Sequence, residues 1–167
     1  MLIKNKVEEP YRPALGIDIG RVISFGDTDG GIPRVKDYLD VPVTEGAILA
    51  IKQLNLEFNG FVYLVSKCRG KTQVRTRHWL SHVHFSEETG VPADHVFFCE
   101  SREGKAPICE TLGVTHFIDD RLEVLGYLKT VPNKFLFHPE EKEIALNFQH
   151  KNSVTRVESW QELLDVI

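Results

Sequence analysis

Short apolar segments alternate with longer, more polar ones along most of the chain. Apolar segments of this length, rich in Val, Ile, Leu and Phe, predict strands buried on both faces of a sheet. A shorter apolar segment near the carboxyl end predicts an edge strand. The predicted strands are 14–19 (ALGIDI), 61–65 (FVYLV), 95–99 (HVFFC), 115–119 (THFID) and 134–137, with the edge strand at 154–157.

Helices are predicted between these strands. In 44–58, apolar residues at 48, 49, 51 and 54 predict one mostly apolar helix face. Gly113 stands where a helix commonly ends, and Ser159 where a closing helix (SWQELLDVI) would be capped. The remaining predicted helices cover 71–84, 105–112 and 121–129.

Strands that alternate with helices predict right-handed βαβ units. The expected fold class is therefore α/β, a Rossmann-like three-layer sandwich with a mainly parallel sheet. Residues 1–12 form a lead-in, and Gly, Asp and Pro in 24–42 predict loops or a small hairpin that acts as a flap or short insertion. The alternation leaves no room for a second large domain, so we expect 1–167 to be a single domain.

Composition narrows the function classes. The chain has 167 residues, 42% apolar and 26% charged, with a net charge of −4, so no global charge favours nucleic acid or an anionic membrane. We therefore expect no nucleic-acid partner. We also expect no membrane partner, because no apolar run approaches the ~20 residues that span a bilayer. The charged start is unlike a signal peptide, and three dispersed cysteines argue against disulfides or a structural zinc site. A cytoplasmic location is expected.

Polar side chains stand where the predicted strands end. Asp18 ends the first strand, Ser66 follows the second, Asp119 and Asp120 follow the fourth, and Lys105 begins the preceding helix. In an open parallel sheet, ligands bind beyond the carboxyl ends of the strands, so these groups should converge on one edge. Carboxylates there can hold Mg²⁺, and a hydroxyl and an ammonium can hold phosphate oxygens.

Each residue also has a simpler interpretation. Asp18 could be a turn residue, Ser66 a helix cap and Lys105 a solvated helix residue. The adjacent acids Asp119 and Asp120 repel each other and usually need a cation or hydrogen-bond donors. The order and placement of all these residues together favour a functional site.

Four segments in order resemble the motifs of the haloacid-dehalogenase-like superfamily: LGIDIGRVI (15–23), LVSK (64–67), GKAPICETLG (104–113) and FIDDR (117–121). The resemblance implies a small, nearly capless hydrolase in which Asp18 attacks phosphorus to give an aspartyl-phosphate. Ser66 and Lys105 would bind the transferring phosphoryl group. The implied Mg²⁺ ligands are Asp18, the backbone carbonyl of Gly20, Asp120 and, directly or through an intervening group, Asp119.

Gly20 departs from the family pattern. Phosphatases of this family normally carry a second Asp two residues after the nucleophile, where it protonates the leaving oxygen and later activates water. General acid–base catalysis contributes roughly 10²- to 10⁴-fold, so we expect slow turnover, a good leaving group or an acid supplied from elsewhere. Asp27 or Asp29 is the hypothetical substitute, although a simple turn is the favoured interpretation of DTDGG.

Basic residues follow Ser66, in KCRGKTQVRTRH. We expect Lys67 and Arg69 to contact the substrate, the alternative being a solvated helix face. His78 and His82, four residues apart with His84 nearby, lack a third ligand at matching spacing for zinc.

The sequence therefore predicts a Mg²⁺-dependent phosphohydrolase that acts on a phosphorylated small molecule or macromolecule. Two alternatives stay open. One is a phosphate-binding pseudoenzyme that senses or scaffolds, and the other is a nucleotidase or phosphotransferase.

Overall fold

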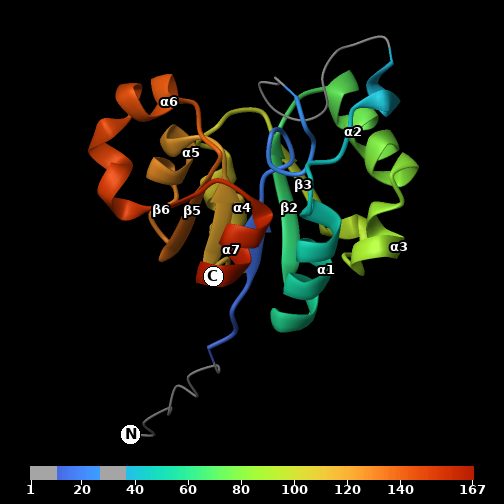
Figure 1. The fold of residues 1–167 in the computed structure, drawn as a ribbon, viewed down its shortest axis with the longest axis horizontal. Coiled ribbons are helices and arrows are strands. Elements are labelled where there is room, and N and C mark those ends of the chain that lie inside the picture. Colours follow the sequence, from blue (N-terminus) through green and yellow to red (C-terminus); the bar gives the residue numbers. More distant parts are fainter. Residues whose placement is uncertain (1–10, 27–36) are drawn as a thin grey trace, which may run out of the picture.

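The computed structural model describes residues 11–26 and 37–167. Its strands form one sheet in which every pair of neighbours is parallel, in the order β3-β2-β1-β4-β5-β6 (Figure 1). This confirms the α/β class and the edge position of the last strand. The strands are β1 (Leu15–Ile17), β2 (Val62–Lys67), β3 (Val96–Cys99), β4 (His116–Asp119), β5 (Asn133–Phe137) and β6 (Thr155–Val157).

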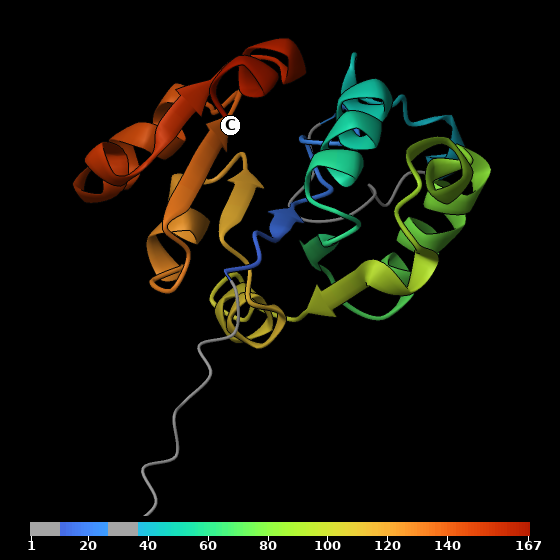
Figure 2. The same cartoon turned by 90° about the horizontal axis from the view of Figure 1, so that it is seen from below.

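Helices cover both faces of the sheet, so the molecule has three layers. Figure 2 shows α1 and α7 on one side of the strands and α4 on the other. Two hydrophobic clusters correspond to these faces, one under each layer of helices. On the first face lie α1 (Ala47–Glu57), α2 (Lys71–His82), α3 (Phe85–Thr89) and α7 (Trp160–Val166), and on the second α4 (Lys105–Leu112), α5 (Leu122–Tyr127) and α6 (Glu141–Leu146). Short 3₁₀ turns occupy Tyr38–Asp40, Ala93–His95 and Phe148–Ser153.

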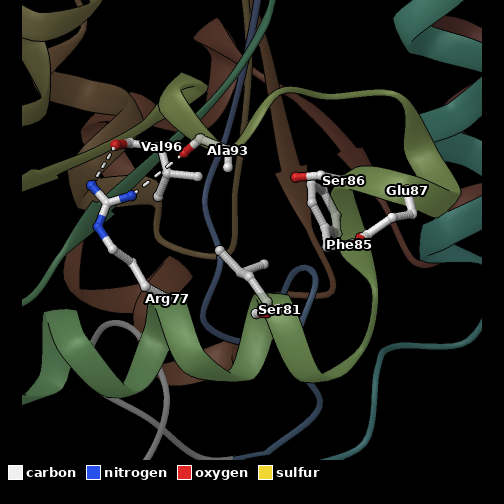
Figure 3. Close-up of a pocket in the computed structure, with 8 residues that line it drawn as sticks. Arg77, Ser81, Phe85, Ser86, Glu87, Ala93 and Val96 are labelled. Carbon is white, nitrogen blue, oxygen red and sulfur yellow. Dashed lines mark hydrogen bonds between the residues drawn. The ribbon is translucent and has the colours of Figure 1, made fainter.

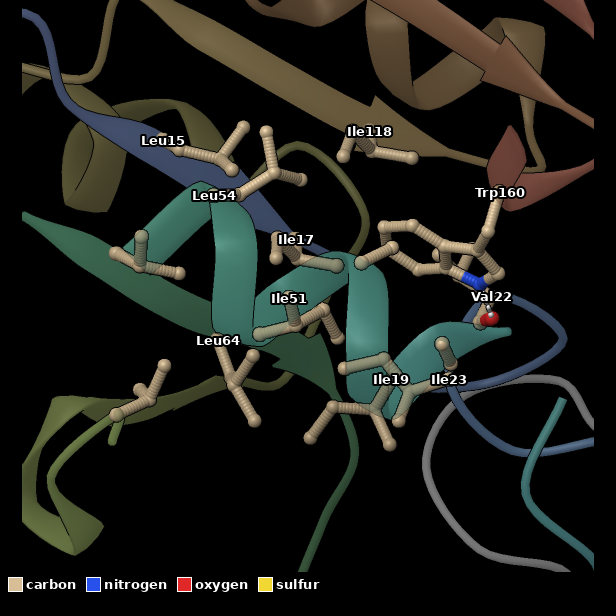
Figure 4. Packing of buried hydrophobic residues seen from close by; sticks show 14 of the residues in the cluster. Leu15, Ile17, Ile19, Val22, Ile23, Ile51, Leu54, Leu64, Ile118 and Trp160 are labelled. Atoms are coloured by element: carbon tan, nitrogen blue, oxygen red, sulfur yellow. Dashed lines mark hydrogen bonds between the residues drawn. The ribbon is translucent and has the colours of Figure 1, made fainter. Parts of the chain in front are cut away.

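The larger cluster ties the end of the chain to its first strand. The indole of Trp160 packs beside Ile17 and Ile118, near Ile51 of α1 (Figure 4). Its Nε1 donates a hydrogen bond to the Val22 carbonyl oxygen at 3.1 Å. The turn that follows β1 is therefore fixed by the closing helix, whose expected cap is also present: Ser159 Oγ accepts from Glu162 N–H at 3.1 Å.

Three local expectations need correction. Leu49 was expected on the buried face of α1 but is 76% exposed. The helix expected over 71–84 ends at His82, and a further helix that was not predicted, α3, begins after His84, which adopts φ 53°. Helix α6 was not predicted at all.

The segment 24–42 is described at its ends only. Ser24 pairs with Val43 in an antiparallel bridge, and Phe25 N–H donates to the Pro42 carbonyl at 2.8 Å. Residues 27–36, which make up most of the expected loop or hairpin, lie outside the described residues. Among the residues described, no helix is long and apolar enough to cross a membrane.

Candidate active site at the carboxyl edge of the sheet

The strand order brings the predicted residues to neighbouring strands. After β1 the chain adds β2 and β3 on one side, then crosses to add β4, β5 and β6 on the other. The strand order therefore reverses beside β1, which is where ligands bind in open α/β sheets. Asp18 follows β1, Ser66 lies near the end of β2, and Asp119 ends β4.

Three carboxylates meet at this point. Asp18, Asp119 and Asp120 are all buried, and each offers a carboxylate oxygen within 4.8 Å of the others. The Asp18 N–H donates to the Ile118 carbonyl at 2.9 Å, which fixes the backbone of Asp18 against β4. The predicted convergence of these acids is present.

Lys105 connects two of the acids. Its Nζ lies 2.7 Å from both Asp18 Oδ1 and Asp119 Oδ2, and the residue is only 2% exposed. The simpler interpretation of Lys105 as a solvated helix residue is therefore wrong. Two buried carboxylates share one ammonium, and a buried charge without its full complement of partners is costly.

The crowding of these buried charges shifts the pKa values of the acids. Burial, reinforced by the charge of Asp119, raises the pKa of Asp18 to about 6 despite Lys105. Burial and the charges of Asp119 and Asp18 raise the pKa of Asp120 to about 8, against the opposing effect of Arg121 and Arg21. For Lys105, burial acts to lower the pKa, but the two carboxylates outweigh burial and raise it. The site has more acid groups than it can ionise cheaply.

A divalent cation fits this donor set. Buried carboxylates whose ionisation is held back are the hard oxygen ligands that Mg²⁺ prefers, and its charge would offset theirs. Both oxygens of Asp119 already accept protein hydrogen bonds, from the Arg121 N–H at 2.9 Å and from Lys105. Asp18 and Asp120 are therefore better placed than Asp119 to bind a metal ion through a carboxylate oxygen.

Ser66 supplies a hydroxyl without a partner. The residue is fully buried in β2, and its Oγ makes no hydrogen bond. A buried polar group left unpaired costs roughly 1–3 kcal/mol, so the Ser66 hydroxyl is available to hydrogen-bond a bound group. The neighbouring Cys68 does not compete as a nucleophile, since burial raises the pKa of its thiol to about 11.

Arg21 is a site residue that the sequence analysis missed. Its Nε lies 3.2 Å from Asp120 Oδ2 and its guanidinium donates to Glu140 Oε1 at 2.6 Å. Arg21 has φ 62°, a left-handed conformation uncommon for a residue with a side chain. The only sequence signal was a cation three residues after Asp18, in a turn whose geometry the sequence does not reveal.

Gly20 is buried in the same turn and bridges to Ser24. The acids proposed to replace its missing carboxylate, Asp27 and Asp29, lie outside the described residues. Both remain predictions.

The basic stretch divides between the two ends of the sheet. Lys67 is the half-buried last residue of β2. Arg69 is exposed and donates to the Glu100 carbonyl at 3.1 Å, so it is held beside the loop after β3. Arg77 lines a separate cavity of about 220 Å³ and donates to the carbonyl of Val96, the first residue of β3, at 3.1 Å (Figure 3). Arg77 therefore contacts the amino end of β3, away from the carboxyl edge beside which Asp18 lies.

The histidines on α2 form no metal cluster. In the part of the chain that the structure describes, the acidic trio is the only group of three or more potential ligands close enough to hold a metal ion. His78 Nδ1 instead lies 3.2 Å from the Tyr38 hydroxyl.

The fold was compared with known proteins. One similar solved structure, from Burkholderia xenovorans LB400, is assigned to the haloacid dehalogenase-like hydrolases, with a TM-score of 0.57 and 17% sequence identity. The chain has a haloacid-dehalogenase-like fold. The similarity covers 79% of this chain but only 61% of the other, so it shows the fold alone. No family model and no curated protein matches the sequence.

Proposed function

We propose that the chain is a Mg²⁺-dependent phosphohydrolase in which the Asp18 carboxylate attacks phosphorus. The observation that supports this most strongly is the buried acidic trio, cross-linked by Lys105 Nζ at 2.7 Å from both Asp18 and Asp119. The haloacid-dehalogenase-like fold also supports the proposal, because the similar solved structure is assigned to the hydrolases. Three buried carboxylates, two of which share the ammonium of Lys105, have little value for stability, which favours a role in chemistry.

Each residue would have a distinct part. Asp18 and Asp120, with the backbone carbonyl of Gly20, would hold Mg²⁺, which when bound would neutralise charge on the phosphate oxygens. The Ser66 hydroxyl would donate to one phosphoryl oxygen and the Lys105 ammonium to another. Lys67 and Arg69 would contact the rest of the substrate.

The reaction would have two steps. A carboxylate oxygen of Asp18 forms a bond to phosphorus while the ester oxygen leaves with its bonding pair and takes up a proton. Water then attacks phosphorus, releases inorganic phosphate and regenerates Asp18. Because Gly20 carries no acid, the proton comes from solvent or from another residue, and turnover is expected to be slow.

A pseudoenzyme that binds phosphate is the second candidate, and Gly20 is the observation that favours it. A nucleotidase or phosphotransferase would use the same groups with a different acceptor or leaving group. The three free cysteines suit a reducing compartment, and we place the protein in the cytoplasm.

Hydrolysis of 4-nitrophenyl phosphate separates these candidates. Wild-type protein should release nitrophenol only with Mg²⁺, and Asp18→Asn should reduce kcat by at least about 10³-fold, because the amide is not a nucleophile. Lys52→Ala, at an exposed position of α1, is the control variant and should keep the wild-type kcat. If neither protein is active but the wild type binds inorganic phosphate with Mg²⁺, the pseudoenzyme is supported instead.

A further inference from the structure

A cavity of about 490 Å³ opens beside the acidic trio. Its walls come from the turn after β1, the start of α1, the carboxyl ends of β5 and β6, and the start of α7. This volume is within the range of about 300–1,000 Å³ found for small-molecule sites. The residues that matter here are Arg21, Phe25, His138, Glu158, Trp160 and Gln161.

The cavity and the acidic trio share a wall. Arg21 lines the cavity, and its Nε lies 3.2 Å from Asp120 Oδ2. Arg21 (φ 62°) and His138 (φ 38°) are two non-glycine residues with positive φ, and both line this cavity. Such conformations cost of order 1–3 kcal/mol and cluster at binding sites. Arg21 therefore connects the cavity to Asp120, one of the three acids beside which a phosphate at Asp18 would lie.

The wall chemistry indicates the kind of group. Phe25 lines the cavity and is 65% exposed, whereas Phe137 and Trp160 line it from almost fully buried positions, 2% and 1% exposed. Aromatic walls favour a flat apolar occupant. Glu45 and Glu158 also line the cavity, and the guanidinium of Arg21 already pairs with two carboxylates, so a second phosphate would meet net negative charge. An uncharged aromatic ring suits these walls better.

The missing acid leads to the same chemistry. Without an Asp at position 20, the leaving oxygen must depart with little help from a proton. A phenolate is a much better leaving group than an alkoxide, since a phenol has a pKa near ~10. Phosphorylated phenols are thus the esters that this site can hydrolyse without a dedicated acid.

We propose that the cavity binds the aromatic leaving group of an aryl phosphate monoester, which makes aryl phosphates the substrate class. This inference rests on the proposed function, because the phosphoryl group must lie at Asp18, Ser66 and Lys105. The Asp18–phosphorus bond forms as the bond from phosphorus to the aryl oxygen breaks. The phenolate leaves with the electron pair and is protonated by water. The His138–Glu158 pair, 3.2 Å from Nδ1 to Oε2, gives the cavity a polar edge.

Two stable phosphonates test the proposal without turnover. Calorimetry with Mg²⁺ gives the dissociation constants of methylphosphonate, which lacks the ring, and of 4-nitrobenzylphosphonate. Wild-type protein should bind the aromatic compound about tenfold more tightly or better. The nitro compound should also quench tryptophan emission in a saturable way, because Trp160, one of only two tryptophans, lines the cavity.

Two matched variants locate the effect. Gln161→Phe fills part of the cavity from an exposed position of α7, and it should reduce the ratio of the two dissociation constants by about fivefold or more. Gln53→Phe makes the same change at an exposed position of α1 outside the cavity, and it should keep the wild-type ratio.

The outcomes separate the two proposals. If neither phosphonate binds, the phosphate site itself is refuted and the leaving-group site is refuted with it. If both bind equally, or if Gln161→Phe keeps the wild-type ratio, the leaving-group site is refuted while the phosphate site stands.

Discussion

In the proposed function, Gly20 would determine how readily a leaving group departs. It stands two residues after Asp18, where phosphatases with this motif normally carry an acid. None of the six glycines with positive φ in the described residues is Gly20, so its backbone can accept a side chain. An acid introduced there would lie beside Asp18 and Asp120, whose charges would favour its protonated form and so its use as a proton donor.

Gly20→Asp is therefore expected to gain activity. For alkyl phosphates, which need a proton on the leaving oxygen, kcat should rise by roughly 10- to 10³-fold, within the limits of general acid catalysis. For 4-nitrophenyl phosphate the gain should be much smaller, because nitrophenolate leaves without help. Steady-state kinetics on both substrates measure the difference. Gly20→Asn has the same shape without the acid, and an equal gain in Asn would contradict the explanation.

Residue identity predicted most of the site, but not all of it. Asp18, Ser66 and the Asp119–Asp120 pair follow from a local pattern, polar residues at the ends of apolar strands, and Lys105 follows from its place at the start of a helix. Arg21 does not, because its contact with Asp120 depends on a left-handed turn that only the folded backbone reveals.

At the scale of elements, β1 packs tightly because of a glycine. A Cβ built on Gly16 would lie 2.6 Å from Phe117 Cε2 and 3.3 Å from Val114 Cγ1. Gly16 therefore allows β4 and the second hydrophobic cluster to approach the strand that carries Asp18. Close approach of the backbone is a common reason for glycine inside a strand.

Gly16→Ala should destabilise the protein by about 1–3 kcal/mol, since the core must shift to admit a methyl group. Urea unfolding followed by circular dichroism measures the change. In a Phe117→Leu background the clash is partly relieved, so the added cost of Gly16→Ala should shrink by about 0.5 kcal/mol or more. A Gly16→Ala protein as stable as the wild type would show that the ring moves freely.

Helix boundaries and faces were predicted less well than helix existence. The apolar run 47–51 gives no unique face, and the buried positions of α1 turn out to be Ala47, Ala50, Ile51 and Leu54, which leaves Leu49 in solvent. Helix α6 (EKEIAL) buries only Glu143, whose Oε1 accepts from the Glu123 N–H of α5 at 3.1 Å. Hydrophobic periodicity carries no signal for such a contact.

For the whole molecule, the strand order is what turns dispersed residues into a site. The alternation of strands and helices predicts a parallel sheet, but the order of the strands depends on which crossovers pack best. The order observed places β1 between β2 and β4, and so places Asp18 between Ser66 and Asp119. The alternation of strands and helices predicted that these residues converge on one edge of the sheet, but the order of the strands was not predicted.

The buried acids also link the stability of the whole molecule to pH and to metal. The pKa values of Asp18 (about 6) and Asp120 (about 8) lie above their ordinary value of 3.8, so between pH ~4 and ~8 the folded protein binds more protons than the unfolded chain. Their contribution to stability is present below pH ~4 and is lost as the pH rises through those values.

Mg²⁺ should reverse this loss, because it binds the ionised carboxylates. Thermal unfolding is measured at pH ~5 and ~8, with and without Mg²⁺, and Mg²⁺ should raise Tm more at pH ~8. When Mg²⁺ is at 100 times its Kd, the free energy of unfolding should increase by about 2.7 kcal/mol. Asp120→Asn removes the group with the higher pKa, so both the rise and its dependence on pH should decrease. Equal rises in Tm at both pH values would mean that Mg²⁺ does not displace protons from these acids, and the proposed metal ligands would then be wrong.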